Sequence, residues 1–157
     1  RVNLMRALRP YLFQGNITDL NMLPRNIGDF HSGGPTVAEK YDITLAINVG
    51  STPFVPRDLP TVYLPMFDDP KPKANDWRKI INVLRLAVEE IHLGGKVFLN
   101  CDAGISRSII FAGMLIAVIE RRPMDDELMQ EIRSPVNGPL LELWKNANDA
   151  LITWWLG

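Results

Sequence analysis

A short apolar run, a glycine-containing loop and a long apolar run follow one another in the second half of the chain. The run 96–100 (KVFLN) is short and follows the breaker pair Gly94-Gly95, which indicates a buried strand. The run 108–120 is too long for a strand and apolar nearly all round, which indicates a buried helix. A buried strand that leads into a buried helix predicts a layered α/β fold.

The loop between these two runs carries the only cysteine of the chain. The octapeptide 101–108 reads Cys-Asp-Ala-Gly-Ile-Ser-Arg-Ser, and it enters the predicted helix at its N-terminus. Backbone N–H groups of such a loop, in which Gly104 has no side chain, can form an anion-binding nest. The same positive environment lowers the pKa of a cysteine thiol, so we expect Cys101 to be a nucleophilic thiolate.

Other residues of the octapeptide suit a bound phosphoryl group. The guanidinium of Arg107 presents a planar fork of donors that matches two phosphoryl oxygens. The hydroxyl of Ser108, in the first helical turn, can hydrogen-bond a thiolate and ease its departure from a phosphocysteine. We expect the intervening loop residues to bind the phosphate; they are Asp102, Ala103, Gly104, Ile105 and Ser106.

This segment resembles the Cys-x5-Arg-Ser loop of the cysteine-dependent protein tyrosine phosphatase superfamily. The hexapeptide 103–108 (AGISRS) is most similar to the dual-specificity branch, in particular its small, atypical single-domain members. The resemblance implies a short central, mostly parallel sheet with helices on both sides and the phosphate loop at the carboxyl end of a middle strand. It covers nearly the whole chain, so one catalytic domain is expected over residues 1–157.

The residue before the cysteine departs from the family pattern. Family members usually have histidine there, which helps to hold the loop carbonyls and to tune the thiol, whereas this chain has Asn100. An amide can still donate a hydrogen bond to a carbonyl. The replacement therefore puts the catalytic rate in doubt more than phosphate binding.

A proton donor for the leaving oxygen is expected upstream of the cysteine. Family members have a general acid in a Pro-x-x-Asp segment about thirty residues earlier, and counting from Pro65 selects Asp68. Asp69 has the same chemistry and is the second candidate. The alternative is that both acids are solvated residues of a turn.

The resemblance implies a hydrolase, a protein phosphatase that acts on phosphotyrosine and on phosphoserine or phosphothreonine through a phosphocysteine. Its expected partner is a phosphorylated protein. A negative charge at Asp102 beside the thiol disfavours highly anionic headgroups, so lipid, RNA 5′-phosphate and phosphoglucan substrates are less favoured alternatives. A phosphate-binding pseudophosphatase, supported by Asn100, and a rhodanese-like sulfurtransferase are rival interpretations.

Composition excludes several other classes. The 157 residues, 46% of them hydrophobic, suit one packed domain, and the net charge of −1 gives no general attraction to nucleic acid or to an anionic membrane. No apolar run reaches about 18 residues, so no membrane span or signal peptide is expected. One cysteine allows no internal disulfide and indicates a reducing compartment, the cytoplasm or the nucleus. No cofactor or metal is implied, because Cys101, His31 and His92 have no metal-site spacing.

The remaining pattern alternates between strands and helices. Strands are expected at 11–15, 43–49 and 61–66, and short helices at 36–41 and 125–133.

A longer helix is expected after the acidic segment, with Asn75 or Asp76 as its cap. Its apolar stripe consists of Trp77, Ile80, Ile81, Leu84, Val88 and Ile91. Pro139 suits the first position of a last helix, in which Trp144 is expected to be a core residue. The loop histidine His31 is expected to be solvated.

Overall fold

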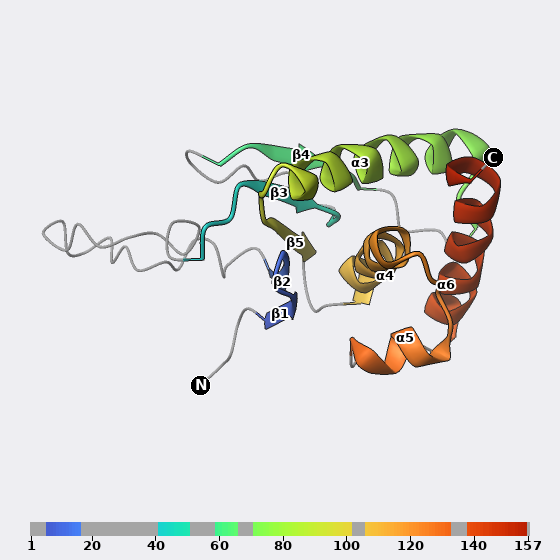
Figure 1. The fold of residues 1–157 in the computed structure, drawn as a ribbon. Coiled ribbons are helices and arrows are strands. Elements are labelled where there is room, and N and C mark those ends of the chain that lie inside the picture. The colour runs from blue at the N-terminus through green and yellow to red at the C-terminus, as the bar shows by residue number, and fades with distance from the viewer. Residues whose placement is uncertain are drawn as a thin grey trace, which may run out of the picture.

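The computed structural model of the chain describes residues 6–16, 41–50, 59–65, 71–101, 106–132 and 138–156. Five described strands form one sheet in the order β1-β2-β5-β3-β4, with β5 at its centre (Figure 1). β1 pairs with β2 in antiparallel orientation, and all other neighbours are parallel. The strands are β1 (Arg6–Arg9), β2 (Leu12–Asn16), β3 (Leu45–Asn48), β4 (Thr61–Tyr63) and β5 (Val97–Cys101). The predicted α/β class with a mostly parallel sheet is confirmed.

The described helices pack on one face of this sheet. They are α3 (Ala74–His92), α4 (Ser106–Glu120), α5 (Asp126–Glu131) and α6 (Pro139–Ala150), and the π-helical turn η1 (Leu151–Trp155) continues α6. Figure 1 shows α4 between β5 and α6, and its apolar side chains are buried on both sides, as in a central helix. None of the described helices has the length and apolar character that a membrane span needs.

The opposite face of the sheet carries a smaller apolar cluster. Its buried members are Phe13, Ile43, Ala46, Leu59 and Phe98. No described helix contributes to this cluster. Residues 36–40 of the helix expected at 36–41 lie outside the described residues, and Tyr41 is in a turn. The described helices therefore support the prediction of flanking helices on the α4 face of the sheet.

Helix α3 begins earlier than the capping pattern predicted. Its N-cap is Lys73, so the expectation that Asn75 or Asp76 caps the helix is wrong. Asp76 instead lies in the first turn, where its carboxylate accepts a hydrogen bond from the Lys73 N–H at 3.1 Å. After the helix, Gly94 adopts a φ of 93°, a left-handed conformation that glycine accepts without strain.

Helix α4 also begins early, at Ser106 rather than Ser108. Arg107 is therefore a residue of the first helical turn, and the loop between β5 and α4 has only residues 102–105. The apolar run underestimates the length of the helix because its first two residues, Ser106 and Arg107, are polar. Strand β4 is shorter than predicted, ending at Tyr63, and β1 was not predicted at all.

The last helices follow the predicted pattern. Asp125 caps α5 by accepting a hydrogen bond from the Leu128 N–H at 2.9 Å. Pro139 occupies the first turn of α6. Trp144 is a core residue, 2% exposed, and its indole N–H donates to the Met124 carbonyl at 2.9 Å.

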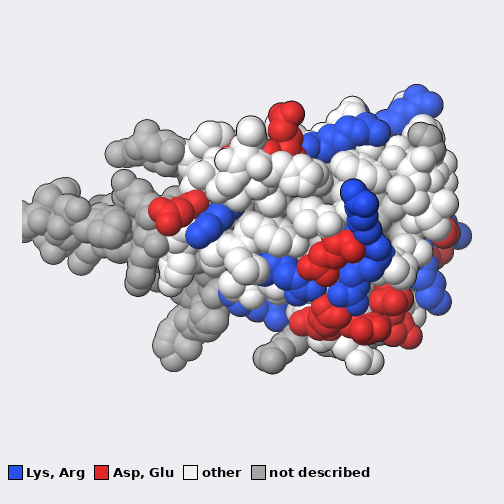
Figure 2. All heavy atoms as spheres, in the orientation of Figure 1, with Lys and Arg blue, Asp and Glu red and all other residues white. Residues whose placement is uncertain are grey.

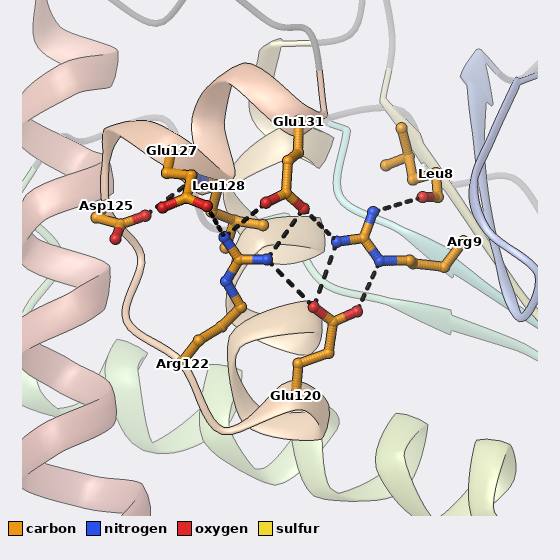
Figure 3. Close-up of polar contacts among 8 residues, drawn as sticks. All are labelled: Leu8, Arg9, Glu120, Arg122, Asp125, Glu127, Leu128 and Glu131. Carbon is orange, nitrogen blue, oxygen red and sulfur yellow. Dashed lines mark hydrogen bonds and ion pairs between the residues drawn. The ribbon is translucent and has the colours of Figure 1, made fainter.

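An ion-pair network joins the edge strand β1 to the helical layer (Figure 3). The guanidinium of Arg9 contacts Glu120, at the end of α4, and Glu131, at the end of α5, each at 2.7 Å. Arg122 contacts Glu131 at 2.7 Å from the other side. Acidic and basic side chains lie intermixed over this part of the surface in Figure 2. The network therefore ties the edge strand β1 to the ends of α4 and α5.

Candidate active site

Cys101 lies at the carboxyl edge of the sheet. Cys101 is the last residue of the central strand β5, where its backbone pairs with Asn16 of β2, and α4 begins five residues later at Ser106 (Figure 1). Carboxyl ends of parallel strands are the usual position of ligand sites in open α/β sheets. Of Cys101, Ser106 and Arg107 the structure describes the backbone, and residues 102–105 lie outside the described ranges.

Ser108 is fully buried in the first turn of α4. Its hydroxyl oxygen accepts a hydrogen bond from Nε2 of Gln14 in β2 at 2.7 Å. The Gln14 carbonyl oxygen Oε1 accepts in turn from Nε of Arg6 in β1 at 2.9 Å. A chain of side chains thus runs from the edge strand to the start of α4.

Asn100 is buried next to the cysteine, on the side of β3. Its Nδ2 donates to Oδ1 of Asn48 at 3.1 Å, and the same oxygen accepts from the Gly50 N–H at 2.9 Å. The backbone carbonyl of Asn100 also accepts from the Val49 N–H at 2.8 Å. Asn100 therefore acts as a donor, as expected for an amide in place of histidine, and it holds the end of β3 against β5.

The sequence analysis missed the partners Gln14 and Asn48. Both lie in predicted strands, and both are buried polar residues within apolar runs. Such residues are almost always hydrogen-bonded. A polar residue within an apolar strand therefore predicts a buried hydrogen bond, although it does not identify the partner.

The candidate general acids follow β4. This strand runs parallel to β3 and ends at Tyr63, so the chain leaves the sheet at the same carboxyl edge from which the cysteine loop starts. Asp68 and Asp69, which come next, lie outside the described residues, as does His31. Within the described ranges, no group of three histidine, cysteine or acidic residues could hold a metal ion.

Similarity to known proteins is detectable in structure and not in sequence. No protein-family model matches the chain, and no curated protein matches it. Human DUSP28 superimposes with a TM-score of 0.74 at 15% identity, covering 97% of each chain. The human tyrosine phosphatase-like serine/threonine/tyrosine-interacting protein gives 0.68 at 18% identity, covering 98% of each chain. PTPMT1 in complex with PI(5)P gives 0.68 at 14% identity, covering 96% of this chain and 98% of its own. The chain therefore has the fold of the dual-specificity phosphatases.

Proposed function

We propose that the protein is a cysteine-dependent phosphatase that hydrolyses phosphate monoesters through a phosphocysteine intermediate. One observation carries this proposal. The segment Cys-x5-Arg-Ser spans the junction between the central strand β5 and the buried helix α4, at the carboxyl edge of a sheet with the dual-specificity phosphatase fold. A thiol at that junction meets the positive end of a helix, which favours the thiolate and binds phosphate.

In the first step, the Cys101 thiolate attacks phosphorus in line with the leaving group. The S–P bond forms while the bond from phosphorus to the leaving oxygen breaks, and Asp68 gives its proton to that oxygen. Arg107 and the amides of residues 102–106 stabilise the negative charge on the equatorial oxygens.

In the second step, water attacks the phosphocysteine, with Asp68 accepting the proton of the water. The S–P bond breaks and its electron pair returns to sulfur. A hydrogen bond from the Ser108 hydroxyl stabilises the departing thiolate. The products are inorganic phosphate and the free enzyme.

The proposed substrates are phosphoproteins, with phosphotyrosine and phosphoserine or phosphothreonine as the reacting groups. The similarity of residues 103–108 to the dual-specificity branch supports this choice, and the acid at position 102 disfavours polyanionic lipid headgroups. PTPMT1, solved in complex with PI(5)P, makes a lipid substrate the alternative. We propose the cytoplasm as the location, because a thiolate nucleophile needs a reducing compartment.

A pseudophosphatase is the second candidate, and Asn100 is the observation that favours it. The residue replaces the usual histidine, and one structural neighbour is described as phosphatase-like and as an interacting protein. Such a module would bind phosphate without turnover.

Hydrolysis of p-nitrophenyl phosphate by the wild-type protein and by Cys101→Ser tests the proposal. We expect turnover in the presence of EDTA, inhibition by vanadate, and loss of turnover in Cys101→Ser, because a serine hydroxyl is not ionised at neutral pH. Tungstate should still bind to the variant, since the amide nest is unchanged. Full activity of Cys101→Ser would exclude the phosphocysteine.

Further measurements separate the alternatives. Tungstate binding without wild-type turnover would favour the pseudophosphatase. Hydrolysis of PI(5)P in vesicles, without hydrolysis of phosphotyrosine or phosphothreonine peptides, would identify the substrate as a lipid. Asp126→Asn, a change of an exposed acid in α5, is the control for surface charge.

A further inference from the structure

We propose that Gln14 is a positioning residue that directs the proton of the Ser108 hydroxyl toward the sulfur of Cys101. This inference rests on the proposed function. It concerns the side-chain series Arg6, Gln14 and Ser108, which connects β1, β2 and the first turn of α4.

The strand register brings this series to the cysteine. Leu12 and Gln14 of β2 lie opposite Val97 and Leu99 of β5, and Asn16 lies opposite Cys101. Leu12, Val97 and Leu99 belong to the cluster that the helices cover. Because side chains alternate along a strand, Gln14 is on this face, and position 101 is the next position on the same face after Leu99. Ser108 enters the same face from α4 and meets Gln14.

The hydrogen bonds to Arg6 and Ser108 fix the orientation of the Gln14 amide. Nε of Arg6 can only donate, so the group of Gln14 that faces it at 2.9 Å is the carbonyl oxygen. The amide N–H then faces Ser108, whose oxygen accepts it at 2.7 Å. A hydroxyl has one proton, and that of Ser108 must therefore be donated away from Gln14. Polarisation along such a series also strengthens the terminal donor.

Burial indicates that packing alone does not explain Gln14. The residue is 1% exposed and Ser108 is fully buried. Burying an amide and a hydroxyl is costly unless they are paired, and an aliphatic residue of similar size would fill the same space without that requirement. The polar pair lies at the first turn of α4, which begins five residues after Cys101, the proposed nucleophile. An oriented hydrogen-bond donor has a chemical use at this position.

A donor aimed at sulfur acts on both states of the cysteine. In the free enzyme it stabilises the thiolate and lowers the pKa of the Cys101 thiol. In the second step it stabilises the thiolate as the S–P bond breaks. Loss of the orientation should therefore slow breakdown of the phosphocysteine more than its formation, and should lower kcat more than kcat/KM.

Two substitutions test this role. Gln14→Met removes the donor to Ser108 at similar volume. Gln14→Glu keeps an oxygen for Arg6 but presents a second acceptor to Ser108, so the hydroxyl proton turns toward the carboxylate and away from sulfur. We expect kcat for p-nitrophenyl phosphate to fall about tenfold in Gln14→Met, the size of one hydrogen bond to a charged group. A larger fall is expected in Gln14→Glu, with a pre-steady-state burst in both variants.

A double-mutant cycle identifies the route of the effect. If Gln14 acts through the hydroxyl, Gln14→Met should add little to Ser108→Ala. Additive losses, or an unchanged kcat and burst in both Gln14 variants, would overturn the inference. Asn148→Met is the matched control for lost stability, because it removes another partly buried amide that accepts from the Met124 N–H at 3.1 Å, away from the start of α4.

A second readout needs no turnover and keeps this inference separate from the proposed function. Cys101 is the only cysteine, so the pH dependence of its alkylation by iodoacetamide reports its thiol pKa directly. We expect both Gln14 variants to raise this pKa relative to wild type and to Asn148→Met. An unchanged thiol pKa would overturn the inference even in an inactive protein, whereas a raised pKa without wild-type turnover would contradict the proposed phosphatase alone.

Discussion

At the scale of residues, the buried amides of Asn48 and Asn100 contribute unequally to hydrogen bonding, and the difference in stability can be measured. Oδ1 of Asn48 accepts from two donors, the Gly50 N–H at 2.9 Å and Nδ2 of Asn100 at 3.1 Å. Removing this oxygen takes away the acceptor of two buried donors. Removing the Asn100 amide leaves the hydrogen bond from the Gly50 N–H to Asn48 in place. The two asparagines are therefore not equivalent, although they face each other in the sheet.

We expect Asn48→Leu to lower the free energy of unfolding by about 1–3 kcal/mol more than Asn100→Leu, the cost of leaving a buried donor unsatisfied. Urea unfolding of both variants and of the double variant measures the difference. The double variant should be more stable than the sum of the single losses predicts. Equal losses from the two single substitutions would show that the shared acceptor is unimportant.

At the scale of elements, the contact between α4 and α6 depends on the absence of a side chain at Gly113. A Cβ at this position would lie 2.6 Å from Cζ3 and 2.7 Å from Cη2 of Trp144. The indole ring cannot move away easily, because it is buried and its N–H is bonded to the Met124 carbonyl. The Trp144 ring therefore packs directly against the backbone of α4 at Gly113.

Gly113→Ala should destabilise the protein by about 1–3 kcal/mol through overpacking, even though alanine favours a helix by about 1 kcal/mol over glycine. Urea unfolding followed by circular dichroism measures this loss. The same substitution in a Trp144→Phe background is the control, because a phenylalanine ring lacks the two clashing atoms. A cost that is unchanged in that background would contradict the packing explanation.

At the scale of the whole molecule, the ion-pair network of Arg9, Glu120, Arg122 and Glu131 links the edge strand β1 to the C-terminal ends of α4 and α5 (Figure 3). Hydrogen bonds from Arg9 lower the pKa of Glu120, and hydrogen bonds from Arg122 and Arg9 lower the pKa of Glu131. A carboxyl whose pKa is lower in the folded state stabilises the protein above its unfolded pKa, about 4.3 for glutamate, and this contribution is lost as the pH falls below that value.

The urea midpoint of the wild-type protein should therefore fall between about pH 5 and pH 3 more steeply than that of Glu131→Gln. Glu127→Gln is the matched control, because Glu127 is 4.0 Å from Arg122 and 79% exposed. Added salt should reduce the difference, since the pairs are only partly shielded from solvent. Parallel pH profiles of wild type and Glu131→Gln would show that the network does not support the fold.

Periodicity predicted the parts of the fold that are local in sequence. The strand before Cys101 and the helix after it are visible as a short and a long apolar run, and α3 is visible as an apolar stripe of period 3.6. Strand β1 was missed because four partly exposed residues at an edge give no apolar alternation. The contact between Gln14 and Ser108 joins residues 94 positions apart and depends on β2 lying beside β5, which no local pattern specifies. The roles of Cys101, Arg107 and Asp68 remain predictions.

The strand order has a consequence for the growing polypeptide. β5 is inserted between β2 and β3, which precede it in the chain and do not pair with each other. During synthesis the hairpin β1–β2 and the pair β3–β4 therefore cannot join into one sheet until the residues of β5, up to residue 101, have left the ribosome. Until then the cysteine has no helix terminus beside it, so the interaction that we propose to activate its thiol is absent. The thiolate that we propose requires the completed junction between β5 and α4, so we expect nascent chains to lack an activated nucleophile.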